Sequence, residues 1–219
     1  MSRILLNLGC GLVAPETWQN YDSSWHQYLS TYPLIDGLLR RVGLTSESRW
    51  PPNVQYLNLN RPWNFGDGSS DVVYAHHVFE HLTQRSAELF LRESRRVLRA
   101  DGVLRLVVPD MAQLAQEYLA QLPSAQAEAL IHLLSAINLQ VPKHSNPLRA
   151  LYEQITGYPS VHKTMYDEPS LSQMLSSHGF VSIRRETRGH SLLIPEIGEV
   201  EKQTGEDRGS LYLDAQPAR

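Results

Sequence analysis

The sequence predicts an α/β fold, a three-layer sandwich of helices around a mostly parallel sheet. Short apolar runs alternate with segments of helical periodicity along most of the chain, and several of the runs end in glycine or in a polar residue. The length of 219 residues suits one domain with a sizeable core. Ligands of such sheets bind beyond the carboxyl ends of the strands, so the residues that follow each strand are the candidates for a site.

The predicted elements follow one another in a regular order. In the first half, strands are predicted over 3–9, 18–22, 53–59, 70–76 and 102–110, and a helix over 84–98. Between the second and third strands, the apolar residues from Trp25 to Val42 have rough helical spacing, interrupted at Pro33.

The second half begins with two predicted helices within residues 111–137, broken at Pro123-Ser124. Their apolar stripes favour ordinary packing, with a hydrophobic acceptor groove as the alternative. Residues 138–168 hold several proline, glycine and asparagine residues and predict an irregular excursion. The last predicted elements are a helix over 167–180 and strands over 180–186 and 209–215. We therefore expect one domain, 1–219, with a helical and irregular insertion at about 111–168 that forms a substrate lid.

Composition excludes several classes of protein. The net charge of −3 lacks the basic excess of a nucleic-acid-binding surface, and no apolar run reaches the length of a membrane span. The first residues are too short an apolar patch for a secretory signal. Because Cys10 is the only cysteine, an internal disulfide is excluded, and a reducing compartment is expected. These observations predict a cytoplasmic protein.

The turn after the first strand reads Gly9-Cys10-Gly11-x-x-Ala14 and formally matches the dinucleotide fingerprint. Pro15 follows at once, and the first acidic residue at a strand end is Asp22, which leaves no room for a pyrophosphate-binding helix. A nucleoside without a pyrophosphate fits this spacing better, with the Asp22 carboxylate accepting hydrogen bonds from a ribose diol. The alternative is that the glycines only make a tight turn.

A second pattern, H-x-x-E-H, is formed by His77, Glu80 and His81 and is known from zinc peptidases. A peptidase carries this motif within a long helix and adds an acidic ligand from elsewhere. Here His77 falls at the end of a predicted buried strand, so it need not share a helical face with His81. The sequence therefore leads us to expect no metal.

Several segments in order resemble the class I S-adenosylmethionine-dependent methyltransferases. The segments are "LLNLGCG", "LNLNRPWNFGDGSSDVVYAHHVFEHL", "ESRRVLRADGVLRLVVPD" and "SSHGFVSIRRE". The nearest branch is that of small, type 11-like predicted methyltransferases linked to surface-polysaccharide and glycan pathways. The resemblance implies a Rossmann-like, mostly parallel seven-stranded sheet with an antiparallel late strand, and S-adenosyl-L-methionine as cofactor.

The resemblance also implies the roles of individual residues. Gly9, Cys10 and Gly11 would pass close to the methionine moiety, and Asp22 would bind the ribose hydroxyls. The adenine would contact Asn58 and Leu59, and the sulfonium end would lie over Ala75 and His76. The sequence departs from the family at Asn7, where many relatives have an acidic residue, at Asn58, which replaces a common aspartate, and at the turn "RADG".

Candidate general bases for a hydroxyl acceptor follow the fourth and fifth strands or lie in the excursion. They are His77, Asp110 and His162. Each has an alternative role: His77 as a loop contact, Asp110 as the cap of the helix that follows, and His162 as part of a polar linker. Glu80 either orients His77 or caps a helix.

The sequence thus predicts methyl transfer to a small-molecule or glycan acceptor, most naturally at oxygen, with no nucleic-acid partner. A non-catalytic cofactor-binding protein that keeps the fold is the alternative from another class. A dinucleotide-dependent oxidoreductase is a third reading.

Overall fold

The computed structural model describes residues 3–24, 34, 37–38, 41, 50–122, 126–138, 161–204 and 209–218. The helical segment expected between Trp25 and Val42 lies outside these residues, apart from four positions that are helical. Most of the expected irregular excursion, residues 139–160, also lies outside them.

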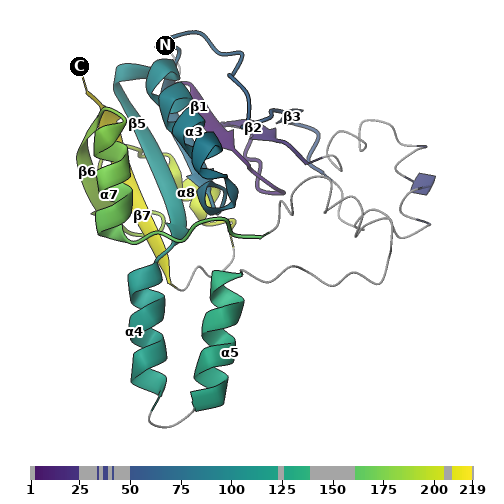
Figure 1. The fold of residues 1–219 in the computed structure, drawn as a ribbon. Coiled ribbons are helices and arrows are strands. Elements are labelled where there is room, and N and C mark those ends of the chain that lie inside the picture. Colours follow the sequence, from purple (N-terminus) through teal and green to yellow (C-terminus); the bar gives the residue numbers. More distant parts are fainter. Residues whose placement is uncertain are drawn as a thin grey trace.

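Seven strands form one sheet in the order β3-β2-β1-β4-β5-β7-β6 (Figure 1). Their bounds are β1 Leu5–Leu8, β2 Gln19–Asp22, β3 Val54–Tyr56, β4 Ser70–His76, β5 Leu98–Pro109, β6 Phe180–Glu186 and β7 Ser210–Pro217. The pairs from β3 to β5 are parallel, whereas β7 is antiparallel to both neighbours. This confirms the expected Rossmann-like, mostly parallel seven-stranded sheet with an antiparallel late strand.

Side chains alternate strictly between the two faces of the central strands, as the period of two requires. On one face, Leu6 and Leu8 join a core with helices α3 (Gln84–Val97) and α7 (Glu168–Ser177). On the other face, Leu5 packs in a second core with α8 (Ile197–Glu201). Helices thus cover both faces, which completes the three layers.

Two helices extend from the carboxyl end of β5 and lie side by side, α4 (Met111–Gln121) and α5 (Gln126–Ile137) (Figure 1). Their apolar stripes pack only in part. Leu114 is buried, but Leu119 and Leu130 are 62% and 44% exposed. The expectation of ordinary packing was therefore wrong for Leu119 and Leu130, because the two helices project away from the sheet instead of lying on it (Figure 1).

The predicted boundaries are confirmed to the residue for β4 and β6, and the others differ at their ends. β3 covers three residues of the predicted 53–59, whereas β5 begins at Leu98 because the chain pairs with Ser70 directly after α3. Helix α8 was not predicted, since it is a single short turn. No helix within the described ranges has both the length and the apolar character to cross a membrane.

A buried ion network ties the late elements to the centre of the sheet. Arg105 of β5 is fully buried and donates to both carboxylate oxygens of Glu201 in α8 at 2.9 Å. It also donates to Asp214 of β7 at 3.0 Å and to the carbonyl of Thr187 at 3.0 Å. Since each buried charge has a partner, the network fixes α8 and β7 against β5.

Candidate functional site

A cavity of about 370 Å³ opens at the carboxyl ends of β1, β2 and β4. Its volume is within the range of small-molecule sites, and its place at the strand ends is where ligands of open α/β sheets bind. It is lined by Gly9, Asp22, Ser23, Leu59, Asn60, His77, Val78, His81, Leu82, Thr83 and Lys163. Three of the predicted cofactor contacts, Gly9, Asp22 and Leu59, are among these residues.

The loop after β1 is held against the end of β2 by backbone hydrogen bonds. The amides of Gly9 and Cys10 both donate to the carbonyl of Tyr21, at 2.8 and 3.0 Å. The amide of Gly11 donates to Asp22 Oδ2 at 2.9 Å. Both glycines have positive φ angles, +68° at Gly9 and +54° at Gly11, which a residue with a side chain rarely adopts.

Asn7 also stabilises this loop. It is buried in β1, and its Nδ2 donates to the carbonyl of Val13 and to Oδ1 of Asn20, each at 2.9 Å. Asn20 in turn donates to the carbonyls of Pro15 and Trp18 at 2.8 Å. The asparagine that departs from the family pattern therefore anchors the chain between β1 and β2.

Burial raises the pKa values of two titratable groups beside the loop, Cys10 and Asp22. It raises the pKa of Cys10 to about 12, assisted by the nearby Asp22 carboxylate, so the thiol is protonated at neutral pH. Burial also raises the pKa of Asp22 above its ordinary value, while amide donors such as Gly11 and Ser24 oppose the shift. Asp22 Oδ1 accepts from the Ser24 amide at 2.7 Å.

The other predicted cofactor contacts lie around the cavity without lining it. Asn58 precedes Leu59, and its Oδ1 accepts from the amide of Asn60 at 2.9 Å. Ala75 is completely buried in the core under the end of β4. The ring of His76 stacks edgewise on that of His77, with 4.6 Å between their centroids.

His77 stands on the cavity wall in a left-handed conformation, with φ +51°. Its Nδ1 lies 2.9 Å from Glu80 Oε1, and its Nε2 lies 3.0 Å from the hydroxyl of Ser210 at the start of β7. Glu80 is fully buried in the short 3-10 helix η1 (Phe79–His81). A carboxylate that accepts from Nδ1 leaves Nε2 as the acceptor nitrogen, which is the tautomer of a general base.

Asp110 is buried at the end of β5, where it begins α4. Its Oδ1 accepts from the amides of Ala112 and Gln113, and its Oδ2 accepts from Arg185 at 2.9 Å. Both carboxylate oxygens are therefore bound, as in a helix N-cap that is also an ion pair.

His162 lies beside Glu80 instead of lining the cavity, with its Nε2 3.9 Å from Glu80 Oε1. Burial lowers the pKa of His162, although Glu80 opposes the shift. Next to it, the amide of Lys163 donates to the Glu80 carbonyl at 2.7 Å, and Lys163 lines the cavity. The segment after the excursion therefore returns to the rim of the site.

Sequence reasoning missed Ser210 and Val78 as members of this arrangement, and it placed Lys163 only within a polar cluster of the expected lid. Ser210 is 133 residues from His77, and nothing in a serine at a strand start indicates such a contact. Val78 lies against the backbone of Gly9, and Lys163 lies on the cavity wall. A signal existed only for Lys163, which belongs to the polar cluster "HKTMYD".

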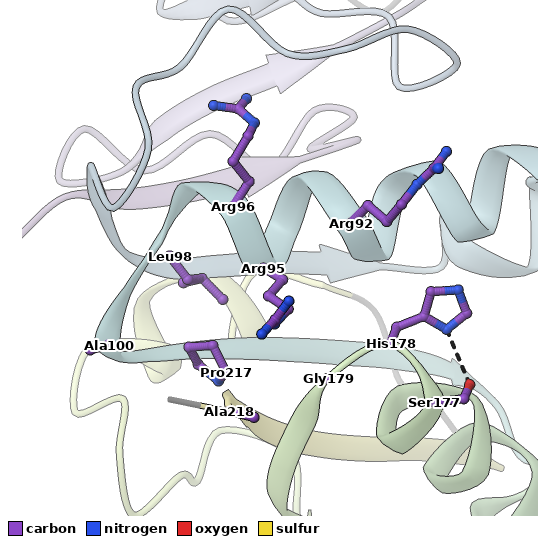
Figure 2. Close-up of a pocket in the computed structure, with 10 residues that line it drawn as sticks. All are labelled: Arg92, Arg95, Arg96, Leu98, Ala100, Ser177, His178, Gly179, Pro217 and Ala218. Carbon is purple, nitrogen blue, oxygen red and sulfur yellow. Dashed lines mark hydrogen bonds between the residues drawn. The ribbon is translucent and has the colours of Figure 1, made fainter.

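A second and larger cavity, of about 850 Å³, lies at the opposite end of the strands, where β5 begins (Figure 2). It is formed by the end of α3, the end of α7 and the terminal residues of β7. Three arginines line this cavity, and one of them, Arg96, forms ion pairs with Glu93 and Asp67. These pairs neutralise part of the positive charge of the cavity. Position at the strand ends, rather than volume, therefore identifies the candidate site.

Comparison with known proteins agrees with this geometry. Residues 35–106, about a third of the chain, match a family model described as "Methyltransferase domain". The chain also resembles a SAM-dependent methyltransferase of Methanosarcina mazei, with 15% identity, a TM-score of 0.53 and coverage of 100% of this chain and 94% of that one. A search of curated proteins finds no match.

A further similar structure is a SAM-dependent methyltransferase of Thermotoga maritima, described as a possible histamine N-methyltransferase. It shares 14% identity at a TM-score of 0.50, over 98% of this chain and 82% of that one. The chain spans about half, 47%, of the chain that holds the citrinin polyketide synthase CMeT domain, with 15% identity and a TM-score of 0.48.

The fold is that of the Rossmann-like methyltransferases. The matched segment is described as a methyltransferase domain, and the two structures that share the fold at TM-scores of 0.50 and 0.53 are described as SAM-dependent methyltransferases.

Proposed function

We propose that the protein transfers a methyl group from S-adenosylmethionine to an oxygen of a small-molecule or glycan acceptor in the cytoplasm. The observation that carries the proposal is the cavity at the strand ends, where a glycine loop and the carboxylate of Asp22 meet. The glycan class of acceptor is supported by the resemblance of the sequence motifs, and the cytoplasm by the single buried cysteine.

The residues at the cavity fit the cofactor. Asp22 offers a half-buried carboxylate for two ribose hydroxyls, and the loop from Gly9 to Gly11 lets a ligand approach the backbone closely. The apolar side chain of Leu59, with Asn58 beside it, suits an adenine ring. We place the sulfonium end over Ala75 and His76. When bound, the cofactor supplies an electrophilic methyl group on a positively charged sulfur.

On the acceptor side, we assign the general base to His77. Glu80 holds Nδ1 of this histidine, so that Nε2 faces a hydroxyl, which in the free protein is that of Ser210. An acceptor hydroxyl would replace the serine as the donor to Nε2. His77 is favoured over Asp110, whose two oxygens are already bound, and over His162, which is buried away from the cavity wall.

We further propose that residues 111–168 form the substrate lid of this single domain. Two observations support it: α4 begins at the carboxyl end of β5, and Lys163 at the other end of the segment lines the cavity. The exposed leucines of α4 and α5 would then face an apolar part of the acceptor.

Calorimetry with S-adenosylmethionine, S-adenosylhomocysteine and NAD tests the cofactor. We expect both sulfur nucleosides to bind, and Asp22→Ala to weaken them roughly tenfold or more, because it removes a charged acceptor from the ribose. Asp101→Asn, at an exposed position near the start of β5 and at the opposite end of the strands, is the matched control and should bind normally. If neither nucleoside binds the wild type, the proposal is wrong; binding of NAD instead would indicate an oxidoreductase.

The role of His77 is tested by methyl transfer to a panel of monosaccharides, nucleotide sugars and a small-metabolite extract. His77→Asn should lower kcat by roughly 10²–10⁴ and leave the cofactor Kd unchanged, since it removes only the base. His190→Asn, an exposed histidine bound to Glu186, serves as the control. Undiminished turnover of His77→Asn would make this residue a wall of the cavity. Cofactor binding without transfer to any acceptor would favour the non-catalytic binding protein.

A further inference from the structure

Three side chains that bind metals in proteins meet beside the cavity. Glu80 and His81 come from η1, and His162 comes from the segment that follows the excursion. One ligand atom of each lies within 4.8 Å of the other two. His162 Nε2 is 3.9 Å from Glu80 Oε1, and the rings of His81 and His162 are 4.7 Å apart.

This cluster contains polar atoms that lack the partners burial normally requires. Glu80 is fully buried, and its Oε2 has no hydrogen-bond partner in the part of the chain that the structure describes. His162 is only 8% exposed, and its Nδ1 likewise has no partner among those residues. A buried carboxylate with an unbound oxygen is costly unless a cation compensates its charge. The hydrogen bond from His77 engages only Oε1.

The residue types of this cluster suit a metal ion. Glu80 offers a carboxylate oxygen, and His81 and His162 each offer an imidazole nitrogen. Two imidazoles beside a carboxylate are a common ligand set for divalent transition metals.

The protein backbone holds this set in place. Nδ1 of His81 lies 3.2 Å from the carbonyl of Val161, which makes Nδ1 the protonated nitrogen and leaves Nε2 free to bind a metal. The amides of Lys163 and Thr164 both donate to the carbonyl of Glu80, at 2.7 and 3.2 Å. Because these bonds fix η1 against residues 161–164, the three ligands are already close before any ion binds.

We propose that Glu80, His81 and His162 bind one divalent transition-metal cation, for which Zn²⁺ is the best fit. Two imidazole nitrogens and a carboxylate oxygen form a three-ligand set that leaves one position for water, as open zinc sites do. His77 is not one of the three ligands, so this site differs from the pair of His77 and His81 that the H-x-x-E-H motif would use. The ion would fasten residues 161–164 to η1 at the rim of the cavity, independently of the methyltransferase proposal.

Metal binding is tested on the full chain after it has been stripped with a chelator. Zn²⁺ and Co²⁺ are titrated separately, with metal analysis after gel filtration, the visible absorption of cobalt and the thermal unfolding temperature as readouts. The wild type should retain about one ion per chain, show a low-symmetry cobalt spectrum and unfold at a higher temperature with zinc. Glu80→Gln and His162→Asn should each bind roughly tenfold or more weakly. His190→Asn, far along the chain on an exposed loop, should behave as the wild type.

The unfolding temperatures of the variants without metal show whether a variant has lost metal binding alone or has also lost stability. Glu80→Gln removes a buried uncompensated charge, so without metal it should unfold at or above the temperature of the metal-free wild type. If the wild type retains far less than one zinc ion, or if Glu80→Gln and His162→Asn bind zinc as tightly as the wild type, the proposed site does not exist. Cofactor binding is measured in parallel, so that either result leaves the methyltransferase proposal to be judged separately.

Discussion

Gly9 directly follows β1 and lines the cavity, at a position with no room for a side chain. Its φ angle is +68°, and a β-carbon there would lie 2.3 Å from Cγ2 of Val78. Gly68 has a similar φ of +56° but no atom within 4 Å of the corresponding position. Alanine substitutions at Gly9 and Gly68 can therefore be compared to separate the cost of backbone strain from the cost of steric contact.

We expect Gly9→Ala to lower the free energy of unfolding by about 2–4 kcal/mol, from left-handed strain plus overpacking against Val78. Gly68→Ala should cost only about 1–2 kcal/mol, because it carries the strain alone. Urea unfolding followed by circular dichroism measures both. Equal losses in the two variants would show that Val78 moves aside at little cost.

His77 adds a different constraint at the same rim. A non-glycine residue with φ +51° is strained, and here the ring is held at both nitrogens by Glu80 and Ser210. The surrounding contacts therefore fix the direction of this imidazole before any ligand arrives.

At the scale of elements, α7 begins with a complete capping box. Asp167 Oδ1 accepts from the Ser170 amide at 2.9 Å, and Ser170 Oγ accepts from the Asp167 amide at 3.1 Å. The hydrogen bond from the Ser170 hydroxyl is the main reason why the pKa of Asp167 is lowered. The cap fixes the start of a helix that buries Leu171 and Leu175 against the sheet.

Asp167→Ala should reduce stability by about 0.5–2 kcal/mol at pH 7, whereas Asp167→Asn should cost much less because asparagine is also a good cap. A lowered folded pKa means that the carboxylate stabilises the fold above its unfolded pKa. This contribution is lost as the pH falls through the folded pKa. The wild type should therefore lose its advantage over Asp167→Asn only in acid. Chemical unfolding at pH 7 and near pH 3 tests this, and an unchanged difference would contradict it.

Elements with a strong local pattern were predictable from the sequence. β4 is a run of apolar residues between polar ends, and α7 has its cap, its early proline and the glycine after its end, so both were located closely. Gly9 and Asp22 were also predicted from their places at strand ends, and Leu59 from the resemblance to the methyltransferases. The contacts of His77 with Ser210 and of Glu80 with His162 could not be predicted, because they depend on how distant strands and loops meet in space.

At the scale of the whole molecule, Arg105 connects three elements through the second core. Burial raises the pKa values of Glu201 and Asp214, and Arg105 opposes this shift in both. Removing the arginine would leave two buried carboxylates without their cation.

Arg105→Met should cost about 3–5 kcal/mol near neutral pH, because it breaks the buried network. Without Arg105 the folded pKa values of the two carboxyls rise further above their unfolded values. The variant should then be most stable in mild acid and lose stability as the pH rises through these folded values. Arg99→Met on the same strand breaks a half-exposed pair with Asp71 and should cost under about 1 kcal/mol. Unfolding curves at pH 5.5 and 8 measure both, and a pH-independent loss in Arg105→Met would contradict this account.

The amide of His162 donates to the carbonyl of Asn138 at 3.2 Å, so the chain leaves and re-enters the domain at one point. A stretch whose two ends are fixed together can change in length at a cost of only about 0.6 kcal/mol for each doubling. We therefore expect insertions or deletions between Asn138 and His162 to leave the sheet and the cavity at its strand ends unchanged.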